Sequence, residues 1–264
     1  IKRDRATSNI CTAQVLLAVM AGMYAVYHGP EGLKEISKSI HLKAVYIKRC
    51  LESIGLQIKY SKYFDTVTVL CDSKKIKELA TLKKINFCFL SNNEISISVN
   101  EKTNLKDLKD IISVFEDFTN KGSTINEFPT DIELINERKS DILSHPVFNL
   151  YHSETSLMRY IKSLENKDLS LTQSMISLGS CTMKLNSASE MIPLSWSEWN
   201  SIHPFVPVDQ AKGYHEVINK LEGYLSEITG FAATSLQPNS GAQGEYSGLM
   251  VIKSYLDKKG DSHR

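Results

Sequence analysis

The residues whose type and spacing most clearly allow a chemical role are Ser240, Gly241, Ala242 and Gln243. They lie in the string Gln-Pro-Asn-Ser-Gly-Ala-Gln-Gly-Glu, where a short apolar run ends and a helix-like run begins. The first N–H groups of a helix and the positive end of its dipole favour a phosphate, a glycine lets the backbone come close, and a serine adds a hydroxyl donor. From spacing alone, a capped turn that binds nothing is the better explanation. No GxGxxG or GxxxxGK[ST] string occurs, so a dinucleotide or P-loop site is not supported.

A second polar group lies within residues 178–186 and consists of Ser180, Cys181, Thr182, Lys184 and Asn186. Such side chains can bind a carboxylate or neighbour a cofactor. A redox role for the cysteine would require exposure and a lowered pKa, which a sequence does not reveal. A polar loop that satisfies its own backbone is slightly the better explanation of these residues.

His203 forms a third candidate, because two tryptophans precede it and Phe205 follows it. Aromatic rings beside a histidine can line a cofactor pocket, although they more often pack against a neighbouring domain or subunit. No histidine pair has the spacing of HExxH, and the five cysteines form no CxxC pair. We therefore expect no metal site and no disulfide framework, and a reducing compartment fits best.

The elements that would position these residues are predicted from periodicity and caps. A long helix is expected at 209–228, a strand at 232–236 and a helix at about 243–258, which places Ser240 at a strand-to-helix turn. Residues 168–208 are expected to be irregular, which is typical of a functional segment or one packed on another subunit.

The first 125 residues predict a small α+β unit that alternates helices and strands. The expected elements are helices at 11–28 (capped by Ser8 or Asn9), 31–54, 73–82 and 104–118 (capped by Thr103 or Asn104), and strands at 66–71, 86–90 and 95–99. Residues 119–152 read as a linker with a helical piece near 131–143, followed by an amphipathic helix at 154–165.

Composition bounds the class of protein. With 264 residues, of which 42 % are hydrophobic, the chain can bury the core of one large domain or two smaller ones. A net charge of +1 gives no reason to expect nucleic acid as a partner. The most apolar run, 15–26, is too short to cross a bilayer. Both ends read as cuts through a longer chain.

Several strings, taken in order, resemble the glycine dehydrogenase (decarboxylating) family, the P-proteins of the glycine cleavage system. These strings are residues 5–12, 24–30, 145–149, 151–155, 178–186 and 237–246. The resemblance covers essentially the whole chain and is weakest at 73–125. Long strings in one order are far more specific than any single motif above.

The resemblance implies an α/β protein of the PLP-dependent transferase fold type I, the aspartate-aminotransferase-like fold. The family has two related halves, and only the second carries pyridoxal phosphate (PLP). Residues 1–125 would be the small C-terminal domain of the first half, 126–152 a linker, and 153–264 the N-terminal arm and the start of the PLP-binding large domain of the second half. The α+β pattern read from the first 125 residues agrees with this assignment.

The resemblance also implies roles for the candidate residues. Ser240, Gly241, Ala242 and Gln243 match the turn that faces the PLP phosphate, which raises phosphate binding above a plain capped turn. The polar group at 178–186 and His203 match sequence near the pocket, without a contact assigned to each. The family's Schiff-base lysine follows Asn-Leu-His, a string absent from this chain. No catalytic residue is therefore assigned, and Lys184 does not match that lysine.

The implied reaction releases the carboxylate of glycine as CO2, with PLP as the electron sink, and passes the aminomethyl group to the lipoyl arm of H-protein. The implied partners are glycine, lipoylated H-protein and the other chains of a homodimer or a two-subunit (αβ)2 assembly, without nucleic acid or membrane. The expected location is the cytoplasm of a bacterium or the mitochondrial matrix of a eukaryote.

Two alternatives stay open. The chain can be a non-catalytic relative that keeps the fold as a structural or interaction module, because it lacks the cofactor lysine. It can also be part of another fold-type-I enzyme acting on an amino acid, which the Ser240 turn would suit but the long strings would not. In every case we expect the chain by itself to be inactive.

Overall fold

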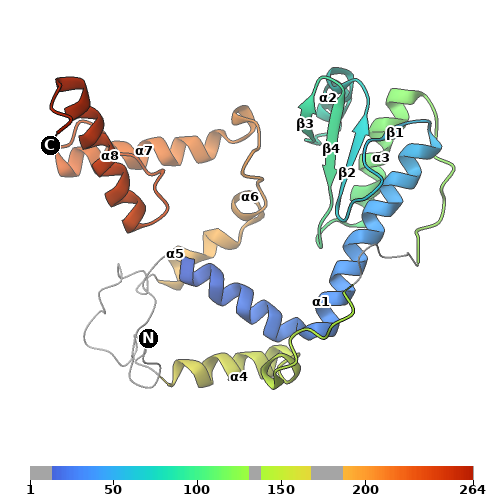
Figure 1. Cartoon of the computed structure of the whole chain (residues 1–264), viewed down its shortest axis with the longest axis horizontal. Coiled ribbons are helices and arrows are strands. Elements are labelled where there is room, and N and C mark those ends of the chain that lie inside the picture. Colours follow the sequence, from blue (N-terminus) through green and yellow to red (C-terminus); the bar gives the residue numbers. More distant parts are fainter. Residues whose placement is uncertain (1–13, 131–137, 168–186, 264) are drawn as a thin grey trace. The chain divides into compact units, whose positions relative to one another are not determined.

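The computed structural model describes residues 14–130, 138–167 and 187–263 (Figure 1). The chain divides into two compact units. Residues 25–157 form one unit, and residues 1–24 with 158–264 form the other. Two helices, α1 (Gln14–Ser53) and α4 (Glu154–Glu165), contribute residues to both units.

Unit 25–157 is built on a four-stranded antiparallel sheet of order β1-β2-β4-β3. The strands are β1 (Gln57–Ile58), β2 (Thr66–Leu70), β3 (Cys88–Ser91) and β4 (Glu94–Ser98). β2 pairs with β4 along all of its length, with Val67 opposite Ile97 and Val69 opposite Ile95. Side chains alternate between the faces of a sheet, so these four residues share one apolar face.

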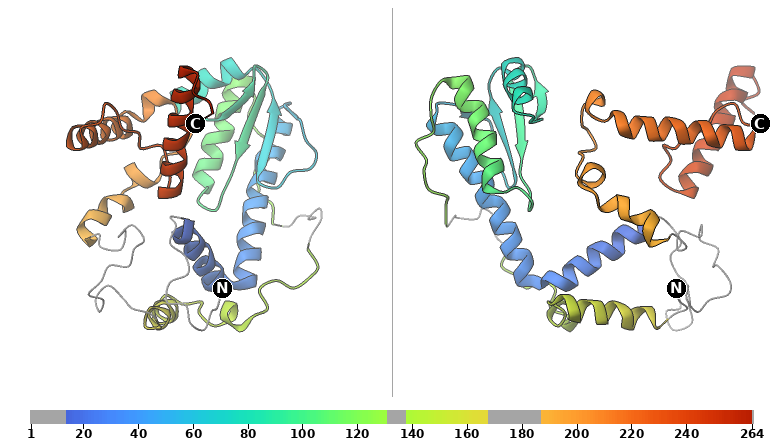
Figure 2. Two further views of the ribbon diagram at one scale, coloured as in Figure 1. Left: turned by 60° about the vertical axis from the view of Figure 1, so that its left-hand side comes forward. Right: turned by 180° about the vertical axis from the view of Figure 1, so that it is seen from behind.

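Three helices cover this apolar face: α2 (Ser73–Leu82), α3 (Leu105–Thr119) and the C-terminal part of α1 (Figure 2). The core residues that they contribute are fully buried: Ile47 and Leu51 from α1, Ile76 from α2, and Leu108 and Phe115 from α3. Each such side chain stabilises the fold by about 1.5–3 kcal/mol relative to its exposed state. The unit is thus a two-layer α+β domain, as the sequence predicted.

The opposite face of the sheet is polar. The hydroxyls of Thr66 and Ser98 hydrogen-bond at 2.9 Å across β2 and β4. The Lys59 ammonium lies 2.7 Å from the Glu94 carboxylate, and because β1 and β4 flank β2, this ion pair crosses the central strand. Thr68, on β2 between them, is only 5 % exposed. This face therefore satisfies its own polar groups.

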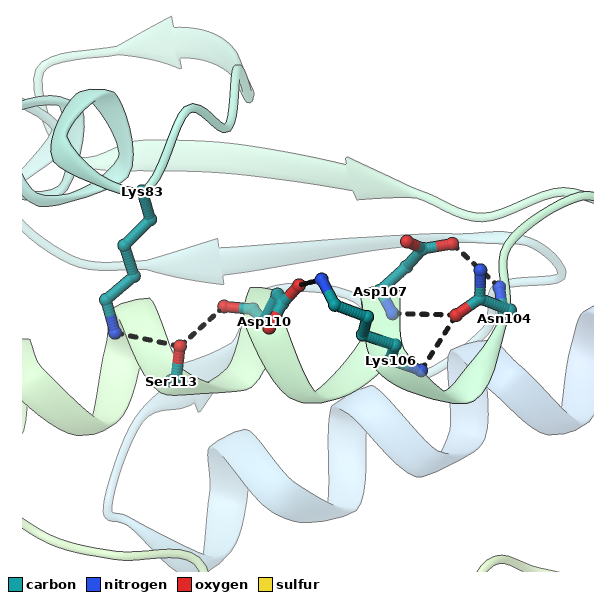
Figure 3. A network of polar contacts seen from close by, with 6 residues as sticks. All are labelled: Lys83, Asn104, Lys106, Asp107, Asp110 and Ser113. Carbon is teal, nitrogen blue, oxygen red and sulfur yellow. Dashed lines mark hydrogen bonds and ion pairs between the residues drawn. The ribbon is translucent and has the colours of Figure 1, made fainter.

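The N-terminus of α3 is fixed by a capping box (Figure 3). The side chain of Asn104 accepts the N–H groups of Lys106 at 2.8 Å and Asp107 at 3.1 Å, and the carboxylate of Asp107 accepts the N–H of Asn104 at 2.9 Å. Further along the same helix, the Lys83 ammonium at the end of α2 donates to the Ser113 hydroxyl at 2.8 Å. The cap sets where α3 begins, and Lys83 ties the two helices together.

The element α1 consists of two helices that meet at a kink. Gly29 has φ 62 and ψ −174, which is not a helical conformation, and Pro30 follows it. This backbone conformation is essentially restricted to glycine, and proline cannot donate to the preceding turn. The two helices expected at 11–28 and 31–54 are therefore confirmed on either side of Gly29 from residue 14 onward, and the expected cap at Ser8 or Asn9 lies outside the described residues.

The second unit contains two long helices preceded by short ones. α7 (Lys212–Thr229) ends at Gly230, and α8 (Gly241–Lys259) ends at Gly260; both glycines have positive φ, as helix C-caps commonly do. The short elements are α5 (Ala188–Met191), η3 (Ile192–Ser195), α6 (Ser197–Asn200) and η4 (Val208–Gln210). The expectation of an irregular 168–208 is therefore wrong for these residues, which form single helical turns held by backbone hydrogen bonds between residues three or four apart; only α5 also has a side-chain cap. Residues 168–186 lie outside the described residues.

Two further expectations need correction. Residues 138–143 are not helical, so the predicted helix near 131–143 fails there, and 131–137 lie outside the described residues. Residues 232–236 form no strand. A strand requires a hydrogen-bonded neighbour, whereas here Leu236 donates to the Glu222 carboxylate at 3.0 Å and Thr234 bonds the Ser226 hydroxyl at 2.9 Å. Among the residues described, no helix combines the length and apolar character that a bilayer crossing requires.

Candidate functional site

The candidate phosphate turn lies at the start of α8. Ser240 is the N-cap, with an extended backbone, and its hydroxyl oxygen accepts the N–H of Gln243 at 3.4 Å. The Gln243 side-chain carbonyl accepts the N–H of Asn239 at 2.8 Å. The first intrahelical bond runs from the N–H of Gly244 to the carbonyl of Ser240, at 2.9 Å. The turn is thus closed from both sides by the side chains of Ser240 and Gln243.

This geometry leaves donors available at the helix start. The N–H groups of Gly241 and Ala242 precede the first intrahelical bond and have no helical acceptor. The Ser240 hydroxyl accepts from Gln243 and keeps its own proton to donate, and the Gln243 amide nitrogen carries two more protons. The first turn carries no acidic residue to repel an anion. The turn therefore offers a phosphate the positive end of the helix dipole and several donors.

The glycine at position 241 is not required by packing. A Cβ built on Gly241 meets nothing within 4 Å in the described part of the chain. Gly241 also lacks a positive φ, since the positive-φ glycines of the described residues are Gly29, Gly55, Gly230 and Gly260. The space above Gly241 is open to a ligand, which agrees with the fit of an anion at this turn.

The loop before the turn is attached to α7. The Glu222 carboxylate accepts the N–H of Leu236, and the Ser226 hydroxyl donates to the hydroxyl oxygen of Thr234. Glu222 and Ser226 lie one helical turn apart on α7, so a single face of that helix positions residues 234–236, which lead into the Ser240 turn. The sequence analysis did not identify Glu222 or Ser226, because nothing in the local pattern indicates such contacts.

His203 lies in a separate turn between α6 and η4. Its Nδ1 accepts the N–H of Phe205 at 3.1 Å, so the neutral ring carries its proton on Nε2, which is left as a donor. The side chain of Phe205 is 90 % exposed. Trp199, in contrast, packs edge-on against Tyr214 of α7 with ring centroids 4.8 Å apart. One of the two tryptophans is thus accounted for by packing.

The remaining candidates are the polar residues of segment 178–186. Ser180, Cys181, Thr182, Lys184 and Asn186 all lie outside the described residues.

On α6, a few residues before His203, the pKa of Glu198 is lowered because its own backbone N–H and the Ser197 hydroxyl hydrogen-bond the carboxylate. Within the described ranges, no group of three or more His, Cys, Asp or Glu side chains is placed to hold a metal ion.

Comparisons with known proteins identify the relatives of this chain. A family model described as "Glycine cleavage system P-protein" matches residues 1–115. Proteins named "Glycine dehydrogenase (decarboxylating)" from Christiangramia forsetii and Flavobacterium johnsoniae are 57 % and 55 % identical over the whole chain. The chain is similar to proteins of the glycine cleavage system P-protein family over its whole length.

The similarity to the P-protein extends to eukaryotes. "Glycine dehydrogenase (decarboxylating), mitochondrial" from Gallus gallus is 49 % identical over the whole chain. The chain spans 28 % of the length of each of the two bacterial relatives and 27 % of the avian one. The resemblance seen in the sequence strings is therefore confirmed, for a segment that corresponds to just over a quarter of these P-proteins.

Proposed function

We propose that this chain forms part of a glycine dehydrogenase (decarboxylating), the enzyme that releases CO2 from glycine and passes the aminomethyl group to lipoylated H-protein. The observation that carries the proposal is the identity of about one half, over the whole chain, to proteins of that name. Glycine and H-protein are the proposed partners, in a homodimer or an (αβ)2 assembly. The proposed location is the bacterial cytoplasm or the mitochondrial matrix.

The proposal extends to the fold and its division. Residues 1–125 belong to the small C-terminal domain of a first half, 126–152 to a linker, and 153–264 to the arm and the start of a PLP-binding large domain. The complete halves have the PLP fold type I. A two-layer α+β unit at 25–157 and a capped helix start at Ser240 support this assignment without deciding it.

The turn at Ser240 holds the phosphate of PLP in this proposal. PLP, when bound, supplies an electron sink for the charge that develops as the carboxylate leaves. The chain's own residues bind and orient: the Ser240 hydroxyl and the N–H groups of Gly241 and Ala242 donate to the phosphate, and the Gln243 amide closes the turn. His203 presents its Nε2 proton as a further donor. The polar residues at 178–186 remain pocket candidates.

The test of activity uses the longer P-protein that contains this segment. Release of labelled CO2 from carboxyl-labelled glycine, dependent on lipoylated H-protein, is the expected result. Ser240→Ala removes a hydrogen bond to a charged group and should weaken PLP binding by about tenfold or more. Asn104→Ala removes a helix cap in the other unit and serves as the matched control, with PLP binding unchanged. If the Ser240→Ala variant binds PLP with wild-type affinity, Ser240 does not bind the phosphate.

A second function, a non-catalytic module, is favoured by one observation: the chain contains no Asn-Leu-His-Lys string. Incubating the 264-residue chain with near-stoichiometric PLP, reducing with borohydride and measuring the mass of the product tests whether the chain has a cofactor lysine of its own. We expect no covalent adduct. A single specific adduct, for example on Lys184, would show that the chain builds its own cofactor site and would overturn the assignment above. A longer protein without glycine-dependent CO2 release would favour the module.

A further inference from the structure

The segment that follows α3 is expected to be a linker, yet it contacts α1 at several places within unit 25–157. Ser123 meets the C-terminal end of α1: its hydroxyl lies 3.1 Å from that of Ser53, and its N–H donates to the Glu116 carboxylate of α3 at 2.7 Å. Burial raises the pKa of the adjacent Cys50 thiol, which also hydrogen-bonds Ser123. The start of the segment is therefore fastened to both helices.

A second contact lies two turns earlier on α1. The ring of Phe128 packs against Tyr46 with centroids 5.4 Å apart, and Phe128 also contacts the apolar core. Pro129, the next residue, is buried. A free tether would expose both side chains, whereas here they cover the outside of α1.

The third contact is at the kink. The Nδ1 of His152 lies 2.7 Å from the carbonyl oxygen of Tyr27. Since a carbonyl only accepts, Nδ1 carries the proton. In an unbroken helix this carbonyl would bond the N–H four residues on, but the break at Gly29 disturbs that pattern. His152 thus supplies a hydrogen-bond donor to the Tyr27 carbonyl at the kink.

Gly29 makes this third contact possible. A Cβ at this position would lie 2.6 Å from Cε1 of His152 and 2.7 Å from the carbonyl oxygen of Phe148. Both distances are shorter than real Cβ contacts, and the positive φ disfavours any other residue independently. The sequence strings 24–30 and 145–155 therefore meet at one glycine.

The three contacts occur in reverse order along α1. As the segment proceeds from Ser123 through Phe128 to His152, its partners on α1 go back from Ser53 through Tyr46 to Tyr27. The 26 residues between Tyr27 and Ser53 correspond to roughly 39 Å of helix. Figures 1 and 2 show the last part of the segment, in yellow-green, ending at the kink of α1.

We propose that residues 121–130 and 138–152 form a strap, fastened along α1 at Ser53, Tyr46 and Gly29, that fixes the start of α4 at the kink of α1. A local hook sets the last part of the strap: in η2 (Pro146–Asn149), the Asn149 amide donates to the carbonyls of Leu143 and His145, both at 3.2 Å. Ser153 directly follows His152 and bonds Ser156 in the first turn of α4. The residue that caps the start of α4, Ser153, thus directly follows the residue that contacts the kink, His152.

Hydrogen–deuterium exchange of the 264-residue chain, read by mass spectrometry on peptides covering 121–126 and 145–157, tests the strap. In the wild type, both peptides should exchange more slowly than unstructured chain. Gly29→Ala should speed exchange at 145–157 by about tenfold or more, because φ strain and two clashes displace the strap. His152→Ala removes a partly exposed hydrogen bond and should speed it by about two- to tenfold.

Controls separate the strap from general unfolding. Gly122→Ala lies in the strap, where an added Cβ meets nothing within 4 Å, and should leave exchange unchanged. His152→Asn keeps an N–H donor near the position of Nδ1 and should restore much of the protection. Peptides from β2 and β4 should keep their wild-type rates in every variant.

Three outcomes would overturn the proposal. The first is exchange of 145–157 at the unstructured rate in the wild type. The second is unchanged exchange in both Gly29→Ala and His152→Ala. The third is a His152→Asn variant that behaves like His152→Ala, which would show that the hydrogen bond to Tyr27 does not fasten the strap. If Gly29→Ala fails to fold, the histidine variants decide alone.

Discussion

Gly241→Ala separates the folding role of the Ser240 turn from its binding role. Gly241 is the first residue of α8, its φ is not positive, and an added Cβ meets nothing within 4 Å. The substitution reduces the entropy of the unfolded chain and improves helix propensity, so it should stabilise the fold by about 0.4–1 kcal/mol. Packing in the described part of the chain thus gives no reason for a glycine here.

Phosphate binding gives a reason. The Cα–Cβ bonds of a helix tilt toward its N-terminus, so a methyl group at position 241 would point to the side from which an anion approaches. Losing even one charge-assisted hydrogen bond costs about 1.5–3 kcal/mol, which corresponds to at least a tenfold weaker PLP complex. We therefore expect Gly241→Ala to raise stability slightly and to weaken PLP binding strongly.

The assay is a pair of measurements. Denaturant unfolding of the 264-residue chain gives the stability, and PLP titration of the longer P-protein, followed by the cofactor's absorbance, gives the affinity. Gly248→Ala, in the same helix and equally free of close contacts, is the matched control and should leave the affinity unchanged. Unchanged PLP affinity in Gly241→Ala, or the same loss in Gly248→Ala, would refute the reasoning.

Three further predictions concern the described units. Asn104→Ala removes the cap of α3 and should lower the free energy of unfolding by about 0.5–2 kcal/mol in urea denaturation, with the sheet register unchanged. Ile47→Ala, at a fully buried position, should cost about 2–5 kcal/mol, and Ile47→Val only about 0.5–1.5 kcal/mol; equal costs would contradict the packing of α1 on the sheet. Burial raises the pKa of Cys71 to about 11, so its neutral thiol stabilises the folded state below about pH 9. This contribution to stability should be lost as the pH rises through 11. Maleimide labelling at pH 8 should modify exposed Cys88 well before Cys71 or buried Cys50, because the thiolate is the reactive form.

The sequence predicted the elements whose signals are local. The helix predicted at 73–82 has these bounds in the structure, where the carboxylate of Asp72 caps it by accepting the N–H groups of Lys74 and Lys75. For the start of α3 the sequence offered Thr103 or Asn104 as the cap, and the structure shows Asn104. A cap is a contact between residues two or three apart, so its side-chain type is readable directly from the sequence.

Elements that depend on distant partners were predicted less well. β1 was missed, since its two residues are held only by pairing with Val69 and Leu70. The strap was read as a linker because its contacts with Ser53, Tyr46 and Tyr27 are 70 or more residues away in sequence. Gly29-Pro30 was read correctly as a break, but its relation to His152 appears only when residues 24–30 and 145–155 are brought together.

The candidate site shows the same division. Its turn is specified by residues 239–244 alone, and the spacing Ser-x-x-Gln indicates the two side chains that close it. The surroundings of the turn are not specified by these local residues. In the middle of α8, Leu249, Met250, Val251 and Ile252 follow one another around the helix, and each is at least 45 % exposed. Apolar side chains on successive sides of a helix are normally buried by neighbouring elements.

The chain spans little more than a quarter of the length of its relatives, and this accounts for the contrast. An anion at a helix start is held by local N–H groups, which the chain supplies, but it is protected from water by elements that pack around the helix. A short string therefore suffices to indicate the turn proposed for the phosphate, whereas the proposed selection of an amino acid and exclusion of water depend on packing that α8 does not make with the described residues of this chain.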